Sequence, residues 1–147
     1  ARYPLAMISP PARNFLNSTF VNVKSLRTIE GRPLLEMHPD DAAARGIADG
    51  ALVRVFNERG QILAGAKATD AIRPGVVKVS EGGWYDPADP AKPGSLCRYG
   101  DVNVLTVDIG TSKLAQGNCG HTAVGDVEKY KGEAPKPQVF VAPKNAA

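Results

Sequence analysis

The sequence predicts a mainly β fold in which short strands close into a barrel. Three observations support this prediction. Short apolar runs recur along the 147 residues, turn residues such as glycine, proline and aspartate separate them, and helical signals are few and brief. Because no long helical pattern lies between consecutive strands, a doubly wound sheet is not expected. A chain of this length fits one domain with a sizeable core.

The first clear elements are a strand and a short helix. Pro33–Met37 is an apolar run typical of a strand. Pro39 suits the first position of a helix, the two aspartates that follow it suit the positive helix end, and Gly46 suits the C-terminal stop. We therefore expect a helix of about two turns after this strand.

A hairpin follows. Ala51–Asn57 predicts a strand in which Leu52 and the Val53/Val55 pair compete for the buried face. The letters NERG connect it to a second strand at Gln61–Thr69, and we expect the two strands to pair. After a turn, Val76–Gly82 predicts another strand.

The second half of the chain is less regular. Residues 82–100 contain three prolines among glycines and aspartates, which predicts a long irregular loop of the kind that carries function or covers a surface. We expect a strand entry at Asp101–Asp108, a short helical turn at Ser112–Gln116 and a last strand at His121–Tyr130. The remaining tail contains Val139–Val141, which can dock as an edge segment.

The composition narrows the class of function. A formal charge of +3 with only 6% aromatic residues lacks the clustered basic and aromatic face of a nucleic-acid binder. The apolar runs are all too short for a membrane span. Cys97 and Cys119 stand alone without metal-ligand spacing, so two separate thiols are favoured over a disulfide.

Motifs that carry chemistry are missing from the sequence. The nucleophile elbow, the Walker loop and the GxGxxG pattern are all absent. His38 stands at a helix start, where a capping role is favoured over catalysis because no nucleophile accompanies it. Glu81 ends a strand, where a turn-stabilising carboxylate is favoured over a general acid.

Polar loops are the remaining candidates. Ile8–Phe20 concentrates hydrogen-bonding groups, Asn103 stands among apolar neighbours, and Gln116–His121 adds further amides. Amide side chains present a donor and an acceptor together, which matches the edge of guanine or a pterin, and Arg13 suits phosphate oxygens. From the residues alone, ligand binding and hydrogen bonding within the loops remain equal alternatives.

Four stretches of the sequence resemble a known family. One reads LEMHPDDAAARGIADGALVRVFNERGQILAGAKATDAIRPGVV, and EGGWYDP, YGDVNVLTVDIGTSKLAQGNCGHT and DVEKY follow it. Together they resemble the C-terminal molybdopterin-dinucleotide-binding domain of the dimethyl sulfoxide reductase family. Within it, they are similar to the dimethyl sulfoxide, trimethylamine N-oxide and biotin sulfoxide reductase branch. The resemblance covers residues 4–130 and leaves 131–147 as a C-terminal tail.

The resemblance implies a six-stranded double-psi β-barrel with short helices. It also implies that the barrel closes over a bis(molybdopterin guanine dinucleotide) molybdenum cofactor together with the remaining catalytic domains of the enzyme. The isolated domain is then expected to be inactive, because the molybdenum ligand and the substrate funnel lie elsewhere. By this resemblance, the cofactor-binding residues are Ser9, Pro10, Pro11, Arg13, Leu16, Asn17, Asn103, Gln116, Gly120 and His121.

Two other functions remain as alternatives. The first is a self-sufficient small enzyme on a double-psi barrel, which would require self-cleavage at the single Gly-Ser step, Gly94–Ser95. The second is a structural interaction module. The sequence assigns neither the physiological substrate nor the compartment, periplasmic or cytoplasmic.

Overall fold

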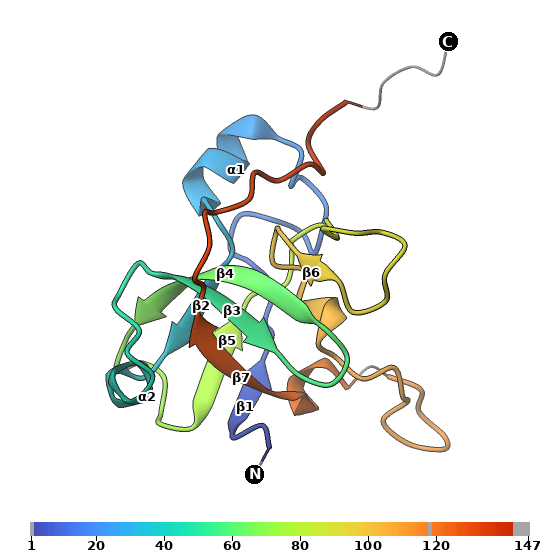
Figure 1. The fold of residues 1–147 in the computed structure, drawn as a ribbon. Helices are drawn as coiled ribbons and strands as arrows, with labels where there is room; N and C mark the ends of the chain where they lie inside the picture. Colours follow the sequence, from blue (N-terminus) through green and yellow to red (C-terminus); the bar gives the residue numbers. More distant parts are fainter. Residues whose placement is uncertain (1, 118, 143–147) are drawn as a thin grey trace.

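A computed structural model of the chain describes residues 2–117 and 119–142. Its centre is a closed barrel with the strand order β2-β5-β1-β7-β3-β4, in which β2 also pairs with β4 (Figure 1). The barrel strands are β1 (Leu5–Ile8), β2 (Leu34–Met37), β3 (Leu52–Phe56), β4 (Gln61–Ala68), β5 (Val76–Val79) and β7 (Val124–Lys129). This closure confirms the predicted six-stranded barrel with short helices.

The strand pairings combine local and distant segments. The β3–β4 hairpin pairs antiparallel from Leu52↔Gly65 to Phe56↔Gln61, as predicted. By contrast, β1 runs parallel to β5, and β2 runs parallel to β4. A two-residue strand, β6 (Leu96–Cys97), pairs with the first residues of β4 outside the closed ring.

Alternating residues of the strands fill the barrel. Val53 and Val55 are fully buried while Leu52 is half-buried, so the valine pair takes the core face of β3. Leu35 and Met37 of β2 are buried in the same way. Truncating such a side chain to alanine typically costs about 2–5 kcal/mol. The alternation therefore fixes which face of each strand points outward.

Helix α2 (Pro39–Ala44) forms as predicted. His38 is its N-cap, where its ring Nδ1 accepts a hydrogen bond from the Asp40 amide at 3.2 Å. The capping interpretation of this histidine is thus confirmed. Gly46 follows the helix with φ +62°, a conformation that glycine adopts without strain.

Helix α1 (Lys24–Glu30) has no counterpart among the predicted elements. It buries none of its residues and has no side-chain cap, so the sequence lacks both usual helix signals. It ends at Gly31, whose φ is +69°. α1 lies beside the C-terminal tail, at the top of the view in Figure 1.

The expected strand at residues 101–108 is wrong. The chain instead forms a 3₁₀ turn, η1 (Val102–Val104), because the Asp101 carboxylate accepts a hydrogen bond from the Asn103 amide at 3.1 Å. Val102 and Leu105 are buried, a helical spacing that the apolar run concealed. Side-chain capping by aspartate competes with strand pairing in this way.

Two further segments differ from expectation in detail. Residues 112–116 form a hydrogen-bonded bend without a helix. A second 3₁₀ turn, η2 (Gly120–Thr122), precedes β7, which begins at Val124. The irregular loop at 82–100 is as predicted apart from β6. Within residues 2–117 and 119–142, no helix combines the length and apolarity needed to cross a membrane.

Candidate functional site

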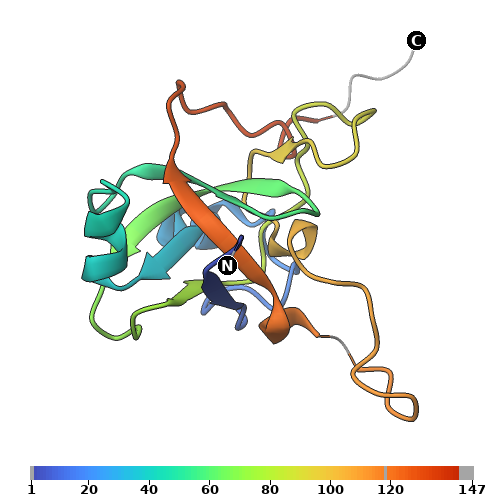
Figure 2. The same cartoon turned by 60° about the horizontal axis from the view of Figure 1, so that its bottom comes forward.

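Six strand ends meet at one end of the barrel. β1, β3 and β5 finish there, and β2, β4 and β7 begin there, as the pairings Ile8↔Lys78, Leu35↔Val79 and Phe56↔Gln61 require. α2 lies at the opposite end, and the loop before η2 extends away from it (Figures 1 and 2). All the predicted site residues lie in connections at this end: 9–17 follows β1, whereas 103 and 116–121 precede β7.

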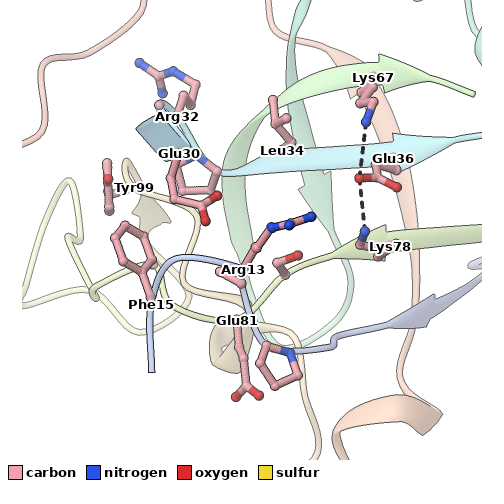
Figure 3. Close-up of a pocket in the computed structure, with 16 residues that line it drawn as sticks. Arg13, Phe15, Glu30, Arg32, Leu34, Glu36, Lys67, Lys78, Glu81 and Tyr99 are labelled. Atoms are coloured by element: carbon pink, nitrogen blue, oxygen red, sulfur yellow. Dashed lines mark hydrogen bonds and ion pairs between the residues drawn. The ribbon is translucent and has the colours of Figure 1, made fainter. Parts of the chain in front are cut away.

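The segment after β1 is held as an extension of the sheet. Pro10 accepts a hydrogen bond from the Glu81 amide at 3.0 Å, and the Ala12 amide donates to the Glu81 carbonyl at 3.3 Å. Ser9 is buried with 7% of its surface exposed. Glu81 thus holds this segment through a parallel β-bridge of its backbone, and its carboxylate points away from the neighbouring cavity (Figure 3).

A side-chain bond and a tight turn fix the rest of this segment. Glu30 Oε1 accepts hydrogen bonds from the Asn14 amide at 2.7 Å and from Asn14 Nδ2 at 2.9 Å. Leu16 and Thr19 then exchange two backbone hydrogen bonds across a turn. Asn17 lies in this turn with φ +50°, a conformation that asparagine tolerates better than most residues. Leu16 and Asn17 are both exposed.

The loop after β5 packs closely against the same segment. A Cβ at Gly82 would lie 3.0 Å from the Phe15 ring, and one at Gly83 would lie 2.5 Å from the Tyr99 carbonyl oxygen. Trp84 donates its indole N–H to the Ser18 carbonyl at 2.8 Å. Gly82 therefore lets the segment after β1 pack against this loop, and Gly83 lets the loop pack against the backbone of Tyr99 and Gly100.

A cavity of about 410 Å³ opens beside this segment, on the outer faces of β2, β4 and β5 (Figure 3). Glu36 Oε1 lies 3.0 Å from Lys78 Nζ and 3.6 Å from Lys67 Nζ. The register explains the cluster, since Glu36 is paired with both lysines across its two neighbouring strands. Arg13 extends toward the cluster from the other wall. Of the predicted residues, Pro11 and Arg13 line this cavity.

Asn103 lies on η1 and is exposed. Its neighbour Asp101 is half-buried, and burial raises the pKa of that carboxyl while hydrogen bonds from Asn103 oppose the shift. The Thr106 hydroxyl donates to the Asn103 carbonyl at 3.2 Å. The amide predicted to sit in an apolar strand is therefore on the surface of a turn.

The Gln116 amide is used inside its own loop. Its Nε2 donates to the Ser112 carbonyl at 2.8 Å, and a Cβ at Gly110 would collide with its side-chain oxygen. Gly120 is half-buried in η2, next to β1, where the Met7 amide donates to the Ala123 carbonyl. The His121 backbone belongs to η2, but its side chain lies outside the described residues, as does Asn118.

The structure brings both groups of predicted residues to one end of the barrel. Only two of these residues, Pro11 and Arg13, line the cavity. The charged lining residues Glu36, Lys67 and Lys78 were missed. Alternation marks them as outward-facing, but only the strand register puts them together. Ser95 is buried and accepts a hydrogen bond from the Asp89 amide, so the Gly94–Ser95 step lies inside a folded loop.

The arrangement suits binding. The exposed asparagines and Arg13 offer donors and acceptors for phosphate or a heterocycle edge. Among residues 2–117 and 119–142, no group of three or more histidine, cysteine, aspartate or glutamate side chains could hold a metal ion. Cys97 and Cys119 are free thiols.

Comparison with known proteins identifies relatives. The family described as "Molydopterin dinucleotide binding domain" matches residues 5–124. The chain is 57% identical over 149 residues to dimethyl sulfoxide/trimethylamine N-oxide reductase of Rhodobacter capsulatus, covering 99% of the chain. It is 48% identical over 134 residues to trimethylamine-N-oxide reductase 1 of Escherichia coli K12, covering 89% of the chain.

The chain spans only a small part of these relatives: 18% of the Rhodobacter protein and 16% of the Escherichia coli protein. Among solved structures, acetylene hydratase from Pelobacter acetylenicus matches with a TM-score of 0.69 and 19% identity. That match covers 87% of the chain and 18% of the hydratase. At this identity, the likeness supports the fold alone.

Proposed function

Because this chain belongs to the molybdopterin dinucleotide-binding domain family, we propose that it binds the guanine dinucleotide parts of a bis(molybdopterin guanine dinucleotide) molybdenum cofactor. It does so as one domain of an oxidoreductase that acts on S-oxides or N-oxides, the substrates named for its relatives. The remaining catalytic domains of that enzyme are its partners.

One observation carries this proposal: the donor-rich connections of the family-matched range meet at one end of the barrel. The segment after β1 and the segment before β7 are neighbours there, because β1 and β7 pair antiparallel at Leu5↔Gly125. A ligand lying across this end can therefore contact both. Packing against Gly82 and Glu30 preforms the first segment, which reduces the entropy lost on binding.

We assign the contacts by chemistry. Arg13 and Asn17 are exposed and offer a guanidinium and an amide to phosphate and heterocycle edges. Ser9 and the two prolines after it position this segment, with Leu16 beside them. Asn103, Gln116, Gly120 and His121 form the second side of the proposed site. When bound, the cofactor supplies the oxygen-atom transfer, while these residues bind and orient it.

The direct test uses the complete enzyme. Asn103→Ala removes an exposed amide without leaving a buried group unpaired, so the fold should be retained. We expect roughly tenfold weaker retention of the cofactor, the effect of about 1.4 kcal/mol. Molybdenum and GMP released per polypeptide measure it. Asp70→Asn, in an exposed turn at the α2 end, is the matched control. Unchanged cofactor content in Asn103→Ala would instead favour the structural interaction module.

A second test uses the 147-residue chain with GMP and an NMR titration. We expect shifts in the amides of residues 8–20 and in Asn103, and much smaller shifts at these positions with UMP, which lacks the guanine edge. Shifts limited to the tail would contradict direct binding. The chain alone should reduce neither sulfoxide nor N-oxide, and turnover by the chain alone would favour the self-sufficient enzyme.

A further inference from the structure

A second hollow lies between α1 and the C-terminal tail, with a volume of about 370 Å³. We call it the α1–tail groove. Tyr99, Pro137 and Phe140 provide its apolar part, and Lys24, Arg27 and Arg32 its charged part. Phe140 packs edge-on against Tyr99 with ring centroids 4.8 Å apart, and its ring lies 5.9 Å from that of Trp84.

The tail is held over the groove by a buried acid. The Gln138 amide donates to Asp86 Oδ2 at 2.8 Å, and Arg98 Nη1 donates to Asp86 Oδ1 at 2.9 Å. The guanidinium of Arg27 stacks on Phe140, 3.9 Å from the ring centroid. The groove is therefore a preformed feature of the fold, because both of its walls are anchored.

The charges of the groove are unbalanced. Its lining, so far as the structure describes it, contains three cationic side chains and no carboxylate. Lys24, Arg27 and Arg32 take part in none of the ion pairs found within residues 2–117 and 119–142. Within the part of the chain that the structure describes, Arg27 and Arg32 donate only to the backbone carbonyls of Val21 and Arg98, at 3.2 and 3.4 Å. The acid of α1, Glu30, accepts two hydrogen bonds from Asn14.

Tyr99 adds a polar group without a partner. Only 5% of the residue is exposed, and its hydroxyl forms no hydrogen bond within the described part of the chain. Burial raises the pKa of Tyr99, the charges of Arg27 and Arg32 oppose this shift, and the charge of Glu30 adds to it. A buried hydroxyl left unpaired costs about 1–3 kcal/mol. A ligand that accepts its hydrogen bond would recover that cost.

The neighbouring cavity provides the contrast. There, Glu36 pairs with both Lys67 and Lys78, whereas Arg32 and Tyr99 lie beside Glu30 at the far end of the view from this cluster (Figure 3). The described lining of the α1–tail groove has three cations and no carboxylate of its own, and guanidinium groups match phosphate geometry.

From these observations we propose that the α1–tail groove is a phosphate-binding site, in which Arg27 and Arg32 hold the anion and Tyr99 donates a hydrogen bond to it. The phosphate is either free or part of a larger ligand whose apolar body rests on Phe140. This inference is independent of the proposed cofactor site, which lies on other residues.

The test is a titration of the 147-residue chain with inorganic phosphate at constant ionic strength, followed by NMR. We expect saturable shifts in residues 24–32 and in the Arg27 and Arg32 side chains. Arg32→Gln should weaken binding roughly 10- to 100-fold, as expected for a charged hydrogen bond. Arg73→Gln removes the same charge from an exposed turn at the α2 end and should leave the affinity unchanged.

Tyr99→Phe is the second variant, because it removes only the unpaired hydroxyl. It should fold at least as stably as the parent chain and bind phosphate roughly 3- to 10-fold more weakly. Phenyl phosphate identifies the source: tighter binding than inorganic phosphate indicates a phosphate on an apolar ligand, and equal binding indicates the free anion. Linear shifts without saturation, or equal losses in Arg32→Gln and Arg73→Gln, would overturn the proposal. A GMP response at residues 8–20 is read separately, so either proposal can fail alone.

Discussion

The two connections that form the candidate cofactor site are built in opposite ways. The segment after β1 is bonded to other parts of the fold: to Glu81 through the backbone and to Glu30 through a side chain. The loop at 108–117 is exposed throughout and bonds mainly to itself, for example from the Thr111 amide to the Gly117 carbonyl. One side of the site is therefore part of the barrel, and the other is a separate unit beside it.

This difference separates two kinds of binding segment. The fold itself sets the geometry of the first, whereas a neighbouring domain or ligand must set the geometry of the second. A segment tied to the barrel keeps its shape whether or not a ligand is present. A loop such as 108–117, with Leu114 exposed to 98%, gains its packing from whatever covers it. Substitutions in the two segments test this contrast.

The close approach at Gly83 should give the largest effect. In Gly83→Ala, the new Cβ would lie 2.5 Å from the Tyr99 carbonyl and 2.7 Å from that of Gly100, both backbone atoms that cannot move aside easily. We expect a loss of about 3 kcal/mol in the free energy of unfolding. Urea denaturation measures it. Gly117→Ala is the control in the exposed loop, where the nearest atom is 3.4 Å away. An equal loss of unfolding free energy in both variants would show that the two regions tolerate an added Cβ equally, contrary to this prediction.

The Glu30–Asn14 contact should give the next effect. Glu30→Ala removes an acceptor that two N–H groups of Asn14 share, and we expect a loss of about 1–2 kcal/mol, discounted for partial exposure. Amide hydrogen exchange should also accelerate in residues 9–17 while η1 is unaffected. A double-mutant cycle with Asn14→Ala isolates the pair, and a coupling energy near zero would show that packing alone holds the segment.

Asp101, at the start of the second connection, should make stability depend on pH. Its pKa is raised by burial, so its contribution is full below the ordinary value of 3.8 and is lost as the pH rises through the folded pKa. Asp101→Asn keeps the capping oxygen and removes this charge. We expect the variant to lose less stability than the parent between pH 4 and pH 7, measured by urea denaturation at each pH. A steeper loss in the variant would contradict burial as the cause.

Leu114 should give the smallest effect in the chain alone. Leu114→Asp changes a side chain that is almost fully exposed, so the free energy of unfolding should shift by less than about 0.5 kcal/mol. In the complete enzyme, the same change should lower the thermal midpoint if other domains cover the loop. Differential scanning calorimetry of the parent and Leu114→Asp proteins, as the chain alone and as the complete enzyme, measures both effects. A midpoint unchanged in the complete enzyme would show that the loop stays exposed there.

Sequence patterns predicted the elements whose signals are local. The capping set around Pro39 and the alternation at Val53 and Val55 each specify structure within a few residues, and both predictions are confirmed. α1 was missed because it has neither a cap nor a buried face. The strand expected at 101–108 failed because Asp101 offers the backbone a closer partner than a neighbouring strand.

The site could be predicted only in part for a related reason. The family resemblance marked residues in two distant connections, and the strand order brings them to one end of the barrel. Neither cavity could be found this way. Glu36 meets Lys67 and Lys78 through register, and Tyr99 meets Arg27 through packing of the tail. Such contacts depend on the tertiary fold, which short-range patterns do not encode.

Trp84 is the single tryptophan of the chain, and its position gives the fold a built-in optical probe. Its indole N–H is bonded to Ser18, and its ring contacts Phe140 of the tail. Fluorescence from this one side chain therefore reports on the segment after β1 and on the tail beside the α1–tail groove. Emission changes on adding GMP or phosphate can then follow either proposed site in real time, without a label.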